Sequence, residues 1–448
     1  MGSVTLRFPD GLVATDGLPT MYRARQHFPS RRIDDLEGAV RRELTVLDGA
    51  IRAGSRIGIT AGSRGVANLV ALLRAVAQEV RARGAEPFVL AAMGSHGGGT
   101  SEGQIEMLAG YGVTPESVGM PIAASMAVEQ IGQLENGMPV YWSVDALRAD
   151  GVILFNRVKP HTDFRGEIES GLAKIGAIGL GKRRGAETIH AYGTEGLTRR
   201  MPATARLICE RGPVLLGLGV VEDGNDETAI VRAIPAGEIG NAGERRLLEE
   251  ARALMPSLPF EQIDVLVVDR LGKEISGSGL DPNVTGRLAI FGVPEPERPR
   301  VTNIVALELT VASHGNAAGL GLADFIPERL LRQVDFEAFY VNSLTSGIGG
   351  VFRGKIPFVL GSDGEAIAAA LRMCGRPDPT AARLVRIQDT LHLGELWISA
   401  SLLEEARAHS RLTLASAPVA WELDERGTLR SEWAERGSAL ALTGGERS

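Results

Sequence analysis

Three histidines of this chain stand where a side chain could do chemistry. His96 follows the apolar segment 87–93, His161 follows the apolar segment 151–158, and His190 precedes a short turn. Histidine titrates near neutral pH and also binds metal ions. Two histidines that flank a substrate can take and give a proton at one carbon, which suits inversion of stereochemistry. For any one of them alone, a loop histidine held by a hydrogen bond is the alternative.

Lys174 is a candidate nucleophile. It lies in the sequence GLAKIG, among apolar and small residues. Burial there would lower the pKa of its amine and leave more of it as the reactive free base. A lysine whose stem is half buried and whose ammonium reaches solvent fits the same pattern equally well.

Two basic positions could bind an anion. Arg64 follows the apolar segment 56–60 and precedes a helical pattern, where it could hold a carboxylate or phosphate with two hydrogen bonds. Lys182 begins a basic run, 182–184, beside several glycines, and backbone of that kind often cradles a phosphate. The alternatives are a turn arginine at the surface for Arg64 and a solvated face for the basic run.

Glycine surrounds these candidates. It accounts for 56 of the 448 residues, well above the usual share of about 7%. The clusters at 94–99 and 166–185 include Gly97 and Gly176, and glycine lets backbone turn sharply or approach a ligand closely. The spacings do not form a dinucleotide-binding, P-loop or G-x-S-x-G motif, so those three classes of site are excluded.

The elements that must position these residues alternate between strand and helix. Apolar segments at 56–60, 87–93 and 151–158 predict buried strands, and the spacing of apolar residues over 66–83 predicts a helix. This order favours an α/β fold with mainly parallel sheets and helices on both faces. Because ligands bind beyond the carboxyl ends of such strands, Arg64 and His96 are expected at one edge.

The second half repeats this alternation. A new strand is predicted at 263–269, after prolines at 256 and 259, and we divide the chain into domains at 1–258 and 259–448. Further strands are predicted at 302–307, 358–360 and 383–387, and further helices at 323–331 and 365–373. Loops of this half are expected to close over a ligand that the first half holds.

Composition excludes several other classes. The net charge of −7 argues against a nucleic-acid surface, which would carry a basic stripe. The apolar segments are far shorter than the roughly 20 residues of a membrane helix, and residues 1–10 do not have the pattern of a signal peptide. Two cysteines neither staple a chain of this length nor form a zinc site. We therefore expect a cytoplasmic protein that binds neither nucleic acid nor membrane.

Taken together, these residues resemble a known family. Gly94-Ser95-His96, Lys159-Pro160-His161, Lys174 and then His190 resemble the nickel-pincer-nucleotide enzymes typified by lactate racemase. The resemblance covers most of the chain and is specific in the first half. It implies two α/β domains with the active site in the cleft between them. It also implies a cofactor, pyridinium-3-thioamide-5-thiocarboxylic acid mononucleotide, which carries nickel and is made by cofactor-biosynthesis proteins.

The resemblance further implies a role for each candidate. Lys174 would tether the cofactor covalently and His190 would ligate nickel, which accepts sulfur and imidazole donors in a planar site. His96 and His161 would be the acid and base of a 2-hydroxy acid racemase or epimerase that removes hydride from the α-carbon. Arg64 matches an anion-binding arginine of the family. By our own inference, the phosphate region of the cofactor would be bordered by Gly97, Gly176 and Lys182.

Two departures and two alternatives accompany this interpretation. The family usually has aspartate where this chain has Ala61, so the cofactor contacts at that point are expected to differ. The glutamine–lysine pair that helps to hold lactate has no clear equivalent here, so we expect a 2-hydroxy acid other than lactate. The first alternative is a metal-dependent hydrolase or lyase built on His96, His161 and His190. The second is a non-catalytic protein that binds a carboxylate.

Overall fold

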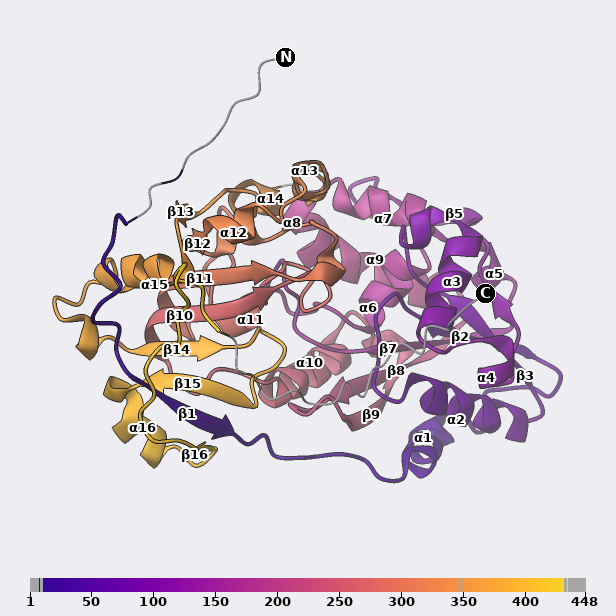
Figure 1. Cartoon of the computed structure of the whole chain (residues 1–448). Helices are drawn as coiled ribbons and strands as arrows, with labels where there is room; N and C mark the ends of the chain where they lie inside the picture. The colour runs from indigo at the N-terminus through magenta and orange to yellow at the C-terminus, as the bar shows by residue number, and fades with distance from the viewer. Residues whose placement is uncertain (1–7, 9–10, 347, 431–432, 434–448) are drawn as a thin grey trace, which may run out of the picture.

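The computed structural model describes residues 8, 11–346, 348–430 and 433. Except for residue 8, segment 1–10, where no signal peptide was expected, lies outside the described residues. Residues 431–432 and 434–448, at the end of the predicted second domain, also lie outside them. Figure 1 shows two lobes, each built around one sheet. The predicted α/β class with mainly parallel sheets is confirmed.

The first sheet contains the strands that carry the candidate residues. β2, β3 and β7 are parallel, as the strand–helix alternation predicted, and the predicted pairing of 229–234 with the preceding strand is confirmed as an antiparallel pair. The order across the sheet is β4 (Ile122–Ala123), β3 (Glu86–Ala91), β2 (Arg56–Ala61), β7 (Gly151–Arg157), β8 (Val214–Glu222) and β9 (Thr228–Pro235). Between β4 and β7 in the sequence, β5 (Val128–Gln133) and β6 (Pro139–Ser143) form a separate antiparallel hairpin.

The second sheet has a parallel part and an antiparallel part. Its order is β13 (Phe358–Leu360), β12 (Phe325–Pro327), β11 (Arg300–Leu309), β10 (Gln262–Leu271), β14 (Leu384–Ile387), β15 (Glu395–Ser399), β1 (Met21–Gln26) and β16 (Leu412–Leu414). The first five strands are parallel, and the pairs from β14 onward are antiparallel.

Two segments differ from the sequence-based expectation. The predicted helix at 323–331 is β12 followed by the short helix α12 (Glu328–Leu331), because a brief apolar run fits either structure. The division at 258 places β1 with the first half, but β1 pairs with β15 in the second sheet. Figure 1 shows β1, in indigo, next to β15. Residues 21–26 are therefore part of the sheet formed by the second half.

Both faces of each sheet are buried, as parallel strands require. In β7, Val152 and Leu154 belong to one apolar core and Ile153 and Phe155 to the other. In β10, Leu266 and Val268 belong to one further core and Val265 and Val267 to another. This alternation explains why the strands read as continuous apolar runs.

Helices cover these faces and largely match the predicted patterns. α2 (Leu69–Ala82) confirms the helix predicted over 66–83, and α15 (Asp363–Arg372) confirms the one predicted over 365–373. The remaining longer helices are α1 (Leu36–Leu44), α3 (Ser101–Gly110), α7 (Lys182–His190), α9 (Met201–Arg211), α10 (Ala242–Leu254), α13 (Phe336–Thr345), α14 (Ile348–Arg353) and α16 (Leu403–Ala408). The shorter ones are α4 (Pro115–Val118), α5 (Val144–Leu147), α6 (Leu172–Lys174), α8 (Gly193–Glu195) and α11 (Pro282–Thr285). In the described part of the chain, no helix has the length and apolar character needed to span a membrane.

Candidate functional site

A cavity of about 370 Å³ lies beyond the carboxyl ends of β2, β3 and β7. Its volume is in the range of small-ligand pockets. Five of the predicted site residues line it: Arg64, His96, His161, Lys174 and His190. The second half contributes Ile290 and several residues of α13, α14 and the turn between them. The expectation that strand-end loops meet at one edge therefore holds for these residues.

His96 is held with one ring nitrogen free. Its Nδ1 lies 2.9 Å from the carbonyl oxygen of Met93, and since a carbonyl only accepts, Nδ1 carries the proton. Gln104 secures the loop by donating to the carbonyl of Gly94. Burial lowers the pKa of His96, and the positive charges of Arg64 and Lys174 lower it further. A neutral ring with an unprotonated Nε2 results.

His161 is held in the opposite sense. The backbone N–H of Asp163 donates to its Nδ1 over 3.0 Å, and its Nε2 lies 2.8 Å from Nζ of Lys174. Burial lowers the pKa of His161 well below its usual value, so the ring is neutral. Because Nδ1 accepts, the single proton of the neutral ring is on Nε2, and Nε2–H donates to the lysine amine.

Lys174 ends α6, and a π-helix, η3 (Ile175–Gly179), follows it directly. Such turns are frequent at functional sites. Glu244 from α10 accepts hydrogen bonds from the backbone N–H groups of Ala173 and Gly240, which fixes the start of α6. Burial lowers the pKa of Lys174 to about 8, and the nearby positive charges act in the same direction. With this pKa, about a tenth of the amine is the free base at pH 7 and about half at pH 8, far more than for an ordinary lysine.

His190 is the last residue of α7, and its imidazole lines the cavity. Within the described residues, its ring nitrogens make no hydrogen bond, so one of them can ligate a metal. Burial lowers the pKa of His190, and the positive charge of Lys174 adds to this effect. Among the described residues, no three His, Cys, Asp or Glu side chains are grouped to hold a metal ion.

Unpaired positive charge gives the cavity its electrostatic character. Arg64 and Lys159 line it, and neither side chain forms a hydrogen bond or ion pair with any described residue. Burial lowers the pKa of Lys159 to about 8. The sequence assigns no role to Lys159, although its place two residues before His161, at the same strand end, is a signal for one. The pair favours an anionic ligand.

Three predicted cofactor-binding residues are not among those that line the cavity: Gly97, Gly176 and Lys182. Lys182 is only 1% exposed, and its ammonium donates to the carbonyl of Ala91 and to Oε1 of Gln104. Gly97 packs against the backbone of α3, and Gly176 packs against Leu154. Their role in holding a cofactor therefore stays a prediction, and in the structure they pack against elements that surround the cavity.

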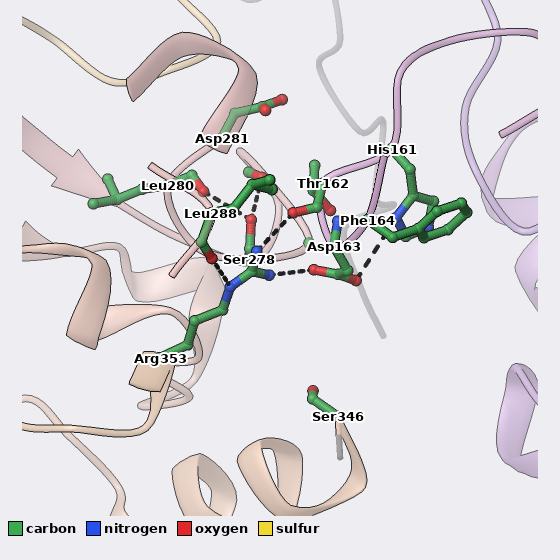
Figure 2. A network of polar contacts seen from close by, with 12 residues as sticks. His161, Thr162, Asp163, Phe164, Ser278, Leu280, Asp281, Leu288, Ser346 and Arg353 are labelled. Atoms are coloured by element: carbon green, nitrogen blue, oxygen red, sulfur yellow. Dashed lines mark hydrogen bonds and ion pairs between the residues drawn. The ribbon is translucent and has the colours of Figure 1, made fainter. Parts of the chain in front are cut away.

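The second half reaches the site through Arg353, which sequence reasoning missed. Figure 2 shows its guanidinium extending toward the loop that carries Thr162 and Asp163. It forms an ion pair with Asp163 and donates to the carbonyl of Thr162 over 2.9 Å. Because Arg353 lies 190 residues from Asp163 in sequence, no local pattern could have indicated this contact.

No protein-family model and no curated protein sequence matches the chain. Several solved structures are similar to it, including the following two. One, a Thermotoga maritima protein from a structural genomics programme, is 13% identical over 73% of this chain and 83% of that chain, with a TM-score of 0.44. The other, the lactate racemase apoprotein of Thermoanaerobacterium thermosaccharolyticum, is 14% identical over 83% of this chain and 88% of that chain, with a TM-score of 0.43. At these values neither similarity assigns an activity to this chain.

Proposed function

We propose that the chain is a racemase or epimerase of a 2-hydroxy acid that works with a nickel-pincer nucleotide tethered to Lys174. One observation carries the proposal: a lysine amine with a pKa of about 8 lies 2.8 Å from a neutral histidine, in a cavity that holds two further histidines. An amine in this state can form a covalent bond with an acyl carbon at neutral pH.

The donor set of the cavity fits the cofactor. A pincer nucleotide brings one carbon and two sulfur donors to nickel, so the protein needs to supply a single nitrogen, and His190 offers one with no hydrogen bond to a described residue. The unpaired Arg64 and Lys159 suit the two anions expected here, the cofactor phosphate and the substrate carboxylate. When bound, the cofactor would accept hydride from the α-carbon of the substrate.

The two remaining histidines would move the hydroxyl proton. The unprotonated Nε2 of His96 is suited to accept it. His161 presents Nε2–H, and once the Lys174 amine is acylated it no longer accepts that hydrogen bond, which frees the ring to donate to the substrate. Exchange of these roles between the two faces of the planar 2-oxo acid gives inversion.

Co-expression with the cofactor-making proteins tests the proposal. We expect nickel in equal amount to the chain and a covalent mass addition that peptide mapping places on Lys174. The variant Lys174→Arg keeps the positive charge but has no amine of low pKa, so it should lack the adduct. A wild-type chain that stays metal-free and unmodified under these conditions contradicts the proposal.

Binding measurements separate this enzyme from a non-catalytic carboxylate-binding protein. In the enzyme, His96→Ala and His161→Ala should each abolish racemisation of any 2-hydroxy acid that turns over. Ligand affinity that is unchanged in both variants, together with no turnover in the wild type, would instead favour the binding protein.

A further inference from the structure

A chain of contacts runs from the second half of the molecule to the amine of Lys174. Arg353, at the end of α14, is 6% exposed, and its Nε donates to the carbonyl of Leu288 over 2.9 Å. Its two terminal nitrogens bind the side chain of Asp163 and the carbonyl of Thr162. Figure 2 shows that His161 extends from the same loop. The guanidinium therefore fixes this loop from the other half of the protein.

The loop in turn fixes the proton of His161. The N–H of Asp163 donates to Nδ1 of His161, so the ring proton is on Nε2, 2.8 Å from Nζ of Lys174. An ammonium has no lone pair to accept that hydrogen bond, whereas a free amine has one. This contact is thus compatible only with an uncharged Lys174.

We propose that Arg353 is a positioning residue: by holding loop 161–163 it shifts Lys174 toward the free amine, so that the docked second half makes the lysine more reactive. The proposal goes beyond the function argued above, because it concerns the chain before any cofactor is attached. It assigns to the second half control over the nucleophile of the first.

The charges that face Lys174 support this role. Burial lowers the pKa of Lys174, Asp163 raises it, and Arg64 and Lys159 lower it further. His96 and His190 also lie at the cavity, and both are neutral near pH 7 because burial lowers their pKa values. Arg353 compensates the charge of Asp163 directly. Loss of Arg353 would both release the loop and leave Asp163 free to stabilise an ammonium.

The test measures acetylation of Lys174 in the full chain without cofactor. In the reaction with N-hydroxysuccinimidyl acetate, Nζ forms a bond to the acetyl carbon, the ester C–O bond breaks, N-hydroxysuccinimide leaves and an Nζ proton passes to the buffer. The rate at Lys174, followed by peptide mass spectrometry from pH 6 to 10, should be half-maximal near pH 8 in the wild type. In Arg353→Gln the midpoint should rise, slowing the reaction at pH 8 by about fivefold for a rise of about one unit.

Two further variants make the result decisive. Asp163→Asn keeps the backbone N–H that holds His161 but removes the negative charge, so its midpoint should stay or fall. Arg376→Gln removes an ion pair to Asp264 elsewhere in the second half and should leave the midpoint unchanged.

Three outcomes overturn the proposal. The first is a wild-type midpoint near that of an ordinary lysine. The second is an Arg353→Gln profile equal to that of Arg376→Gln. The third is an upward shift of the midpoint in both Arg353→Gln and Asp163→Asn, which would indicate a general loosening of the site. If Arg353→Gln does not fold, the direction of the shift in Asp163→Asn decides. A low midpoint in a chain that never acquires nickel would leave this inference intact and contradict only the proposed function.

Discussion

At the scale of single residues, the two histidines at the strand ends are prepared for different tasks. His96 donates through Nδ1 to a carbonyl and presents a bare Nε2, whereas His161 accepts through Nδ1 and presents Nε2–H. Backbone groups make the hydrogen bonds at Nδ1 of both rings, and the carboxylate of Asp163 lies 3.9 Å from Nδ1 of His161, beyond hydrogen-bond distance. The site thus holds one proton acceptor and one proton donor before any substrate binds, which is the asymmetry that general acid–base catalysis needs.

The state of His96 predicts how activity depends on pH. A base must be unprotonated, and burial lowers the pKa of His96 below its usual 6.5. As pH falls, kcat/KM should therefore stay on its plateau past 6.5 and decline only as His96 takes up a proton. A pH–rate profile of the cofactor-loaded enzyme measures this.

A control histidine separates a local effect from a general one. The pKa of His392 is raised, chiefly by its hydrogen bond to Asp389, and this residue does not line the cavity. His392→Gln should leave the profile unchanged, and His96→Gln should remove the activity. A decline that begins above pH 6.5 would count against His96 as the base.

At the scale of elements, the loop between β3 and α3 depends on how closely its backbone packs. Gly97 has φ of +66°, and a Cβ placed on it would lie 2.5 Å from the carbonyl carbon of Gly103. The next residue, Gly98, has φ of +65°, but a Cβ there would meet nothing within 4 Å. The two glycines share a backbone conformation and differ in the space around them.

These neighbours form a matched pair of variants. Both Gly97→Ala and Gly98→Ala incur the strain of a left-handed residue, about 1–2 kcal/mol. Only Gly97→Ala also drives a methyl group into the backbone of α3, so it should lose roughly 1–3 kcal/mol more. Denaturant unfolding monitored by circular dichroism gives both values. Equal losses would show that the close contact with α3 is not important.

The sequence predicted most of these elements because their patterns are local. The strands β2, β3 and β7 are apolar runs bounded by turn residues, and the helix α2 has its apolar residues on one face. The pattern failed where a short run fits two structures, as at β12, and where pairing is distant, as between β1 and β15. The pairing of Met21 with Ser399 joins segments that are far apart in the sequence, so no local pattern indicates it.

At the scale of the whole molecule, an acidic chain encloses a cationic cavity. The net charge is −7, yet Arg64, Lys159 and Lys174 line one site from the first half, with Arg353 from the second. Sequence reasoning found the residues that follow strand ends, because the topology brings such positions together. It could not find which cations stay unpaired, since that depends on which carboxylates the folded chain places beside them. Arg157, for example, lines the cavity but is paired with Glu222.

This separation of charge predicts that the chain without cofactor binds a simple anion. Inorganic phosphate should bind at the cavity, and Lys159→Met should weaken it about tenfold or more, because a charge-assisted hydrogen bond contributes about 1.5–3 kcal/mol. Isothermal titration calorimetry at low and high salt measures the affinity. Lys355→Met is the matched control, since Lys355 is exposed and lies over the ring of Phe352, outside the residues that line the cavity.

The dependence on salt separates a buried site from a surface one. Ions screen exposed charges strongly, with a Debye length of about 10 Å at 0.1 M, but screen partly buried charges much less. Affinity that depends on Lys159 should therefore fall only modestly as sodium chloride is raised. Binding that is lost equally in Lys159→Met and Lys355→Met, or that disappears in moderate salt, would place the anion on the surface and leave Lys159 without this role.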